Sequence, residues 1–164
     1  MIEVYKPLNT LNNPEDKLKI FLAGGIDKAP DWQKEAENYF IEKYSNFPIA
    51  LFNPRAETKF EKEDHVTHEK QVKWEFDHLI KADAILFWFP ENAPCTTSLF
   101  ELGFWVLSGK TFIGINPGHY KEKSLKTQIK LINDFRYPIN QITINSSLED
   151  TINNTILSLL IYKK

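Results

Sequence analysis

The segment DAILFWFPENAPCTTSLFELGFWVLS, residues 83–108, gives the clearest indication of the fold class of this chain. It opens with a continuous apolar run, turns at a Pro-containing segment and continues into a helix-length segment that is apolar on nearly every face. Strands covered on both faces have continuous apolar runs, whereas strands with one wet face alternate between apolar and polar residues. The stretch therefore predicts a buried strand over residues 83–89 and a buried helix over residues 97–108.

Short apolar or β-branched runs alternate with helix-length segments along the rest of the chain as well. The predicted strands lie at residues 19–23, 49–52, 83–89, 111–115 and 140–144. The predicted helices lie at residues 31–44, 67–81, 97–108, 124–135 and 147–161. Regular alternation of strand and helix predicts the α/β class, with a doubly wound, five-stranded parallel sheet flanked by helices.

The N-terminal residues and one internal segment do not fit this alternation of strands and helices. Residues 1–17 are polar and contain Pro7, Pro14 and two adjacent Asn residues, so we expect an irregular N-terminal leader. Residues 18–164 are then expected to form a single α/β domain. The charged residues 54–66 predict a long surface loop, which is either merely solvated or long enough to act as a lid.

Composition excludes several functional classes. The 20 Lys and Arg residues are balanced by 22 Asp and Glu residues, so the net charge of −2 provides no basic field for nucleic acid. The single cysteine, Cys95, excludes an intrachain disulfide and a Cys-rich zinc site. No apolar signal core begins the chain, and no run reaches the roughly 20 apolar residues of a membrane span. We therefore expect a soluble, cytoplasmic protein.

The sequence predicts no metal and no cofactor. Gly24 and Gly25 follow the first strand but form neither GxGxxG nor a P-loop, since no GK[ST] follows them. His65 and His68, with Asp64, have a spacing that metal ligands can have, but no third strong ligand lies nearby.

Polar and turn-forming residues follow the predicted strands, at residues 24–27, 53–55, 90–97 and 116–120. In a doubly wound sheet, ligands bind outside the carboxyl ends of the strands, near the point where the strand order reverses. Cys95 lies in one of these segments without a neighbouring His base, so we expect its thiol to form part of a pocket wall rather than to act as a nucleophile.

Glu101 is the one carboxylate in the apolar helix. Burial would raise its pKa, whereas a position in the first helical turn would favour its ionised form. One interpretation is an active-site carboxylate. The alternative is a capping box, in which Thr97 or Ser98 is the N-cap and Glu101 lies about three residues later. The local sequence leaves both interpretations open.

The preceding helix supplies a second carboxylate. At 100° per residue, its predicted buried stripe consists of Val72, Phe76, Leu79 and Ile80. Glu75 lies at the edge of that stripe, where it either reaches a pocket or remains an ordinary surface carboxylate. Trp74 lies opposite the stripe, so we expect it to contact a partner subunit. Two carboxylates in one site are what glycosyl transfer requires, one as nucleophile and one as proton donor.

Taken in order, these segments resemble the nucleoside 2-deoxyribosyltransferase-like family. The resemblance rests on IFLAGGI, Trp32-Gln33, Asn53-Pro54-Arg55, QVKWEFDHLIKADAILFWFPENAP and ELG, within about residues 19–128. It implies a flavodoxin-like fold and a reaction in which Glu101 attacks the anomeric carbon of a 2′-deoxynucleoside. It implies that Glu75 positions or protonates the departing base.

The resemblance also implies that Gly24 and Gly25 contact the base, and that Thr96, Thr97 and Ser98 lie near the 5′ end of the sugar. Asp27 and Asn53 lie at the same rim, and Trp32 and Phe89 are placed where a base could stack on them, although core packing is the alternative for the aromatic run that contains Phe89. The full set of expected substrate-binding residues is Gly24, Gly25, Asp27, Trp32, Asn53, Phe89, Thr96, Thr97 and Ser98.

The expected activity is cleavage of the N-glycosidic bond through a covalent glycosyl-enzyme, with transfer of deoxyribose to another base. Classical transferases of the family carry an acidic residue in the loop shortly before the nucleophile, where this chain has Cys95, Thr96 and Thr97, so the resemblance does not determine the preferred base and sugar. Hydroxyl groups at a helix start can hold a 5′-phosphate as readily as a 5′-hydroxyl, so a 2′-deoxynucleoside 5′-monophosphate N-glycosidase is an alternative. A non-catalytic nucleotide-binding module, in which Glu101 is only a cap, is the alternative from another class. The expected partners are a deoxynucleoside, a free nucleobase and further copies of the chain in a homo-oligomer, with no nucleic acid and no membrane.

Overall fold

The computed structural model describes residues 1–7, 14–55, 65–136 and 141–162. Its elements follow one another as β1 (Ile2–Tyr5), β2 (Leu18–Gly24), α1 (Trp32–Tyr44), β3 (Ile49–Phe52), α2 (His65–Lys81), β4 (Ala84–Phe89), α3 (Thr96–Trp105), β5 (Thr111–Ile115), α4 (Glu122–Arg136), β6 (Ile144–Asn145) and α5 (Leu148–Tyr162). The α/β class and the alternation of strands and helices are confirmed.

The strands form one parallel sheet in the order β1-β3-β2-β4-β5-β6. The chain moves from β2 outward to β3 on one side and then returns to β4 on the other side. The strand order therefore reverses between β2 and β4, which are paired up to Gly24 opposite Trp88. This reversal is the place where a doubly wound sheet binds its ligands.

The sheet has one strand more than predicted, because residues at the start of the chain join it. Strand β1 pairs with β3 from Ile2 opposite Ile49 to Tyr5 opposite Phe52. The prediction of an irregular leader is therefore wrong for Ile2–Tyr5. An edge strand has only one neighbour and is partly exposed, so it needs fewer apolar residues than the central strands and gives a weak sequence signal.

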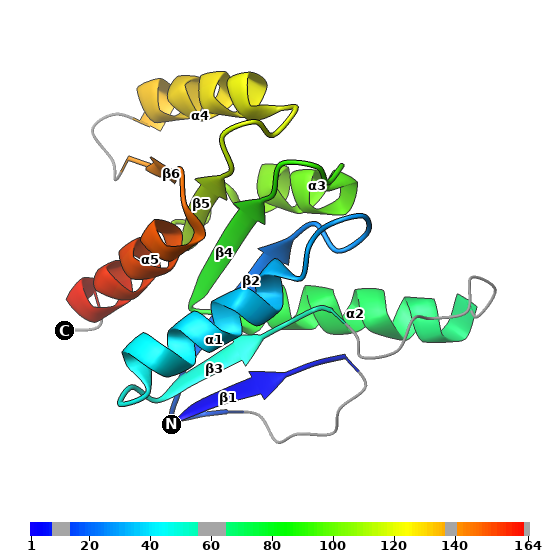
Figure 1. The fold of residues 1–164 in the computed structure, drawn as a ribbon, viewed down its shortest axis with the longest axis vertical. Helices are drawn as coiled ribbons and strands as arrows, with labels where there is room; N and C mark the ends of the chain where they lie inside the picture. Colours follow the sequence, from blue (N-terminus) through cyan, green and yellow to red (C-terminus); the bar gives the residue numbers. More distant parts are fainter. Residues whose placement is uncertain (8–13, 56–64, 137–140, 163–164) are drawn as a thin grey trace.

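Each face of the sheet has its own apolar core. Helices α1 and α5 cover one face, where Phe40 and Ile152 pack with alternate residues of the strands. Helices α2, α3 and α4 cover the other face, with Leu79, Leu102 and Ile129 in its core (Figure 1). All six residues of β4 are buried, as its continuous apolar run predicts.

Helix α2 presents a different face to the sheet from the one predicted. Val72, Phe76 and Ile80 are each about half exposed, at 50%, 51% and 52%. Trp74 instead packs on the core, with its ring 6.3 Å from that of Phe21 between centroids. The predicted partner contact of Trp74 is therefore replaced by a contact within the chain, and of the predicted stripe only Leu79 is buried.

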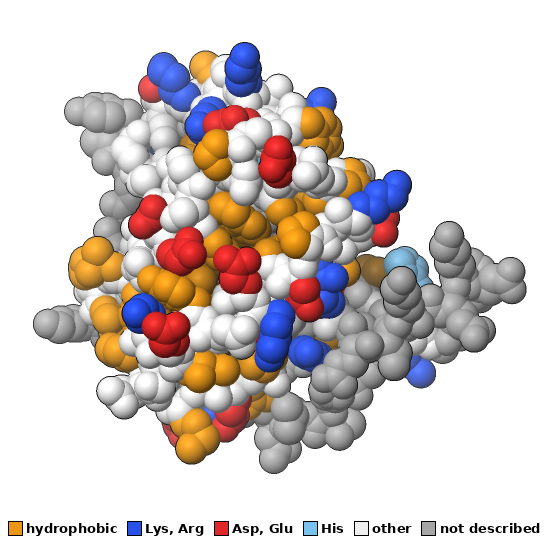
Figure 2. All heavy atoms as spheres, viewed as in Figure 1, with side chains coloured by type: hydrophobic (Ala, Val, Ile, Leu, Met, Phe, Trp, Pro, Cys, Tyr) orange, Lys and Arg blue, Asp and Glu red, His pale blue; other side chains and the backbone are white. Residues whose placement is uncertain are grey.

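The surface carries charges of both signs. Figure 2 shows acidic and basic side chains scattered among apolar ones on the face that Figure 1 presents. Within the described residues, none of the helices is both long and apolar enough to cross a membrane. The expected surface loop or lid, residues 54–66, lies mostly outside the described residues.

Candidate active site

A cavity of about 480 Å³ opens at the carboxyl ends of β2 and β4. The loop after β2 forms one wall, helix α2 a second, and the start of α3 with the residues before it a third. The structure brings eight of the expected site residues together in its lining: Gly24, Gly25, Asp27, Glu75, Thr96, Thr97, Ser98 and Glu101. The volume lies within the range that small-molecule sites usually have.

Three expected substrate-binding residues do not line this cavity. Trp32 is buried, and its indole N–H donates a hydrogen bond of 2.9 Å to the carbonyl of Gly25. Phe89 is fully buried and stacks on Phe87, with 6.2 Å between ring centroids. Asn53 is buried as well. All three side chains are occupied within the fold, so the structure does not bring them into the cavity lining with the other expected residues.

The two glycines at the end of β2, Gly24 within the strand and Gly25 directly after it, are required by close packing. A Cβ on Gly24 would meet the carbonyl oxygen of Trp88 and lie 2.6 Å from the ring of Trp32. A Cβ on Gly25 would lie 2.7 Å from the sulfur of Cys95. The loop can therefore approach α3 and β4 this closely only with glycine at both positions.

The start of α3 excludes the capping interpretation of Glu101. The helix begins at Thr96, and its N-cap is Cys95, which makes no side-chain capping hydrogen bond. Glu101 is thus the sixth residue of the helix, beyond the first turn in which a capping-box carboxylate lies. Its carboxyl group lines the cavity instead.

Burial dominates the electrostatics of Glu101. Removal of the carboxyl group from water raises its pKa to about 8, and the nearby charge of Glu75 adds to the rise. Burial also raises the pKa of Glu75, but a hydrogen bond from Gln71 and the charge of His68 oppose that rise. With a pKa of about 8, Glu101 holds a proton at neutral pH, whereas the rise in the pKa of Glu75 is partly offset.

Comparison with known protein families identifies a family whose model covers the part of the chain that forms the cavity. A family model described as nucleoside 2-deoxyribosyltransferase like matches residues 17–119. The chain belongs to this family. The matched region contains strands β2 to β5 and all of the described residues that line the cavity. No curated protein matches the chain.

Some lining residues of this nucleoside 2-deoxyribosyltransferase-like protein were not among the expected ones. His68, Gln71 and Val72 precede Glu75 by seven, four and three residues and line the cavity with it. Helical spacing from Glu75 could have found all three. Cys95 also lines the cavity, and burial raises the pKa of its thiol to about 11, so the thiol is protonated at neutral pH.

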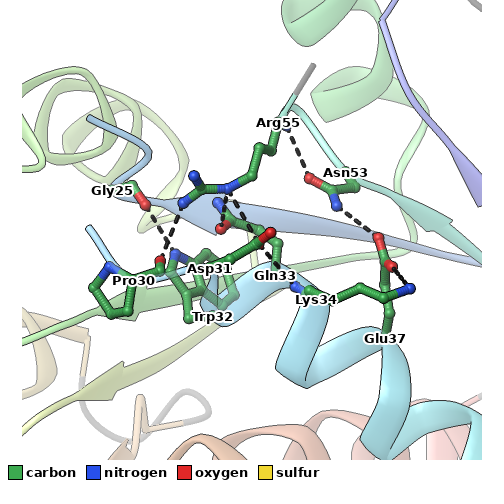
Figure 3. Close-up of polar contacts among 9 residues, drawn as sticks. All are labelled: Gly25, Pro30, Asp31, Trp32, Gln33, Lys34, Glu37, Asn53 and Arg55. Atoms are coloured by element: carbon green, nitrogen blue, oxygen red, sulfur yellow. Dashed lines mark hydrogen bonds and ion pairs between the residues drawn. The ribbon is translucent and has the colours of Figure 1, made fainter. Parts of the chain in front are cut away.

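A partly buried polar network lies beside the loop that forms one wall of the cavity (Figure 3). The guanidinium group of Arg55 donates to Gln33 and to the carbonyl of Pro30, and it forms an ion pair with Asp31. The side chain of Asn53 donates to Glu37 at 2.6 Å, while its carbonyl oxygen accepts from the backbone N–H of Arg55. The network thereby ties the end of β3 to the start of α1.

A second cavity, of about 460 Å³, lies near the amino-terminal ends of β4 and β5 and is lined by Asp83, Lys110 and Arg136, among others. The ammonium group of Lys110 is bound to the carbonyls of Leu79, Ile80 and Ala82. Its volume resembles that of the first cavity, so volume does not distinguish the two. Of the two cavities, only the first has more than one carboxylic residue among its described lining residues, and there burial and the charge of Glu75 raise the pKa of Glu101.

Among the described residues, no group of three or more His, Cys, Asp or Glu side chains could hold a metal ion. Asp64 and the side chain of His65, which have metal-like spacing with His68, lie outside the described part of the chain.

Proposed function

We propose that this protein cleaves the N-glycosidic bond of a 2′-deoxynucleoside and transfers the deoxyribose to another base. The observation that carries the proposal is the pair of carboxyl groups in one cavity, where the charge of Glu75 raises the pKa of Glu101. Two carboxyl groups on one substrate are the usual apparatus of glycosyl transfer. Membership of the nucleoside 2-deoxyribosyltransferase-like family supports a nucleoside as the substrate.

In the proposed reaction, a carboxylate oxygen of Glu101 bonds to C1′ while the bond between C1′ and the base nitrogen breaks. The base takes the departing electron pair and a proton from Glu75. A second base then attacks C1′, displaces Glu101 and returns its own proton to Glu75. Two displacements at C1′ retain its configuration. With water as the acceptor, the same steps give hydrolysis.

The proposed reaction requires that the carboxyl groups of Glu75 and Glu101 together hold one proton. At neutral pH, Glu101 holds a proton because burial and the charge of Glu75 raise its pKa to about 8. For the reaction, the proton must lie on Glu75 and Glu101 must be ionised. Positive charge that develops on the sugar as the bond to the base breaks favours the ionised form of Glu101, so the transition state favours the proton on Glu75 rather than on Glu101.

A 5′-monophosphate substrate is the second candidate. Thr96, Thr97 and Ser98 lie at the start of α3 and line the cavity, and the free amides of a helix start favour an anion. Among the described lining residues, however, there is neither Lys nor Arg. This composition favours the nucleoside with an uncharged 5′-hydroxyl group.

The test is to incubate wild-type protein and Glu101→Gln with deoxynucleosides, their 5′-monophosphates and a second free base. We expect base exchange by wild-type protein, its loss in Glu101→Gln, and a deoxyribosyl adduct in the intact mass of wild-type protein with a slow substrate. Glu91→Gln, on an exposed loop residue outside the cavity, should be fully active. Full activity of Glu101→Gln would refute the proposed nucleophile, and binding without turnover would favour a non-catalytic module.

We also propose that the protein forms a homo-oligomer through the outer faces of α2 and α3. Val72, Phe76 and Ile80 on α2 are half exposed, and Phe100, Phe104 and Leu107 on and just after α3 are 79%, 64% and 58% exposed. These six side chains offer on the order of 600 Å² of apolar surface, against about 800 Å² per partner in a standard interface. Val72 also lines the cavity, so this surface reaches the site.

A further inference from the structure

We propose that Gln71 is a positioning residue that holds one oxygen of Glu75, Oε1, so that the other oxygen, Oε2, gives the proton to the departing base. This inference rests on the proposed function and assigns a role to a residue next to the acid. Gln71 and Glu75 lie one helical turn apart on α2, and both line the cavity.

The side-chain amide of Gln71 connects Glu75 to the sheet. Its nitrogen donates to Oε1 of Glu75 at 2.8 Å and to the carbonyl of Pro54 at 3.4 Å. A side-chain amide has two N–H groups, so it can serve both acceptors together. Pro54 lies between Asn53 and Arg55, whose side chains are fixed by the network in Figure 3. The acid is thus held from the segment that follows β3 as well as from its own helix.

The bond to Oε1 determines where Glu75 carries a proton. An amide N–H donates to an oxygen lone pair, so the oxygen that accepts it serves as the carbonyl oxygen when the carboxyl group is protonated. The proton then lies on Oε2, which has no hydrogen-bond partner among the described residues. During cleavage, the O–H bond at Oε2 breaks, the proton moves to the base, and Gln71 stays bonded to the resulting carboxylate.

The other titratable groups around Glu75 come from each wall of the cavity. Glu101 faces it from α3, Asp27 from the loop after β2, and His68 from its own helix. The hydrogen bond of Gln71 and the charge of His68 lower the pKa of Glu75, while burial raises it. Removal of the Gln71 amide should therefore raise the pKa of Glu75. A higher pKa keeps the acid protonated and does not by itself slow the reaction, so a slower reaction would report lost orientation.

The test compares wild-type protein with Gln71→Met, and uses Lys73→Met as the matched control. Lys73 forms an exposed pair with Asp77 at the same spacing on the same helix. Each protein is assayed on a purine deoxynucleoside, whose base leaves when protonated, and on 4-nitrophenyl 2-deoxyriboside, whose leaving group departs as a stable anion. A carboxyl ¹³C NMR titration, assigned with Glu75→Gln, measures the pKa of Glu75 without need of catalysis.

For Gln71→Met we expect kcat on the deoxynucleoside to fall roughly 10- to 100-fold, which is part of the usual contribution of a general acid. The rate on the 4-nitrophenyl substrate should change by less than about 3-fold, and the pKa of Glu75 should rise. Lys73→Met should change none of these quantities. This pattern separates orientation of the acid from a general loss of structure.

An equal loss on both substrates, or no loss on either, would overturn the role of Gln71 while the proposed function stands. An unchanged pKa of Glu75 in Gln71→Met would overturn the hydrogen bond on which the inference depends. If wild-type protein cleaves neither substrate, the proposed function fails and the inference fails with it.

Discussion

Partial burial of the Glu101 carboxyl group affects both its pKa and the stability of the folded protein. Leu99, Leu102 and Trp105 of α3 pack on the core, and burial of the Glu101 carboxyl group beside them, together with the charge of Glu75, raises its pKa to about 8. A protonated acid is the form that a buried site tolerates. The nucleophile of the proposed reaction is the other form, so ionisation of Glu101 should lower the stability of the folded protein.

This reasoning gives a pH dependence of stability. The folded pKa of about 8 lies above the ordinary value of 4.5, so the favourable contribution of Glu101 is complete below about pH 4.5 and is lost as the pH rises through about 8. Glu101→Gln should therefore be close to wild type in stability near pH 5. Near pH 9 it should be more stable by about 1–3 kcal/mol, below the full linkage value because the cavity is open to water.

Urea denaturation at both pH values measures this difference. Asp134→Asn, on an exposed residue of α4, serves as the control and should show the same stability difference from wild type at both pH values. A constant difference between Glu101→Gln and wild type across this pH range would contradict the raised pKa.

Two glycines of the chain should respond in opposite directions to the same substitution. Gly24→Ala places a Cβ against the Trp88 backbone and the Trp32 ring, and should lower the free energy of unfolding by about 1–3 kcal/mol. Gly103→Ala, in α3 with no atom within 4 Å of the added Cβ, should raise it by about 0.5–1 kcal/mol. Thermal denaturation of both variants checks the signs, and a neutral Gly24→Ala would refute the close packing of the loop.

For single residues, the sequence predicts which residues lie near the cavity more accurately than it predicts which side chains point into the cavity. Glu75, Glu101 and the residues at the ends of β2 and at the start of α3 line the cavity as expected. Trp32 and Phe89 have side chains that suit stacking on a base and packing in a core equally well. Only the three-dimensional arrangement shows that the core takes both.

The sequence predicts the wrong orientation for helix α2. The reason is that the face of α2 that points toward the sheet also borders the cavity. The inner face of an ordinary surface helix is apolar, but the inner face of α2 borders a cavity and carries the polar residues Gln71 and Glu75. Its outer face carries Val72, Phe76 and Ile80. Periodicity therefore finds the correct helix and assigns the apolar row to the wrong side.

The link between β3 and α1 depends on a buried carboxylate. Glu37 is 2% exposed and accepts hydrogen bonds from Asn53 and Lys34. Asn53→Ala should lower the free energy of unfolding by about 2 kcal/mol, because it leaves part of a buried charge without its donor. Adding Glu37→Gln should restore some of that loss, since the buried charge is removed.

A double-mutant cycle by urea denaturation measures this coupling. Glu42→Gln, at an exposed residue of the same helix, replaces Glu37→Gln in the control cycle and should be additive with Asn53→Ala. Additive effects of Asn53→Ala and Glu37→Gln would argue against the network as a link between the two elements.

At the scale of the whole molecule, the candidate cavity and the exposed apolar rows of α2 and α3 lie on the same side of the sheet. Helices α2 and α3 carry the two carboxyl groups toward the cavity and expose apolar residues on their outer faces. Regular alternation of strands and helices made the fold class predictable, since the handedness and order of such units are restricted. How copies of the molecule meet depends on which surfaces remain exposed, and the sequence pattern assigned these to the wrong face of α2.

Self-association through the outer faces of α2 and α3 can be tested with substitutions that introduce a charge. Phe76→Glu and Phe104→Glu should each convert the oligomer to a monomer, because each places a charge in the proposed apolar interface. Light scattering coupled to size-exclusion chromatography measures the mass. Leu131→Glu, at a residue of α4 that is 61% exposed, should remain oligomeric. A monomeric wild-type protein would refute the proposed interface.

The short strand β1 has a practical consequence. Its partner β3 is entirely buried, and the N–H of Asn53 extends their pairing by donating to the carbonyl of Tyr5 at 2.9 Å. Deletion of residues 1–5 would leave the backbone of an apolar strand unpaired, and such an edge invites a strand from another molecule. Shortened versions for crystallisation or expression should therefore begin before Ile2, because versions that begin after Tyr5 are expected to aggregate.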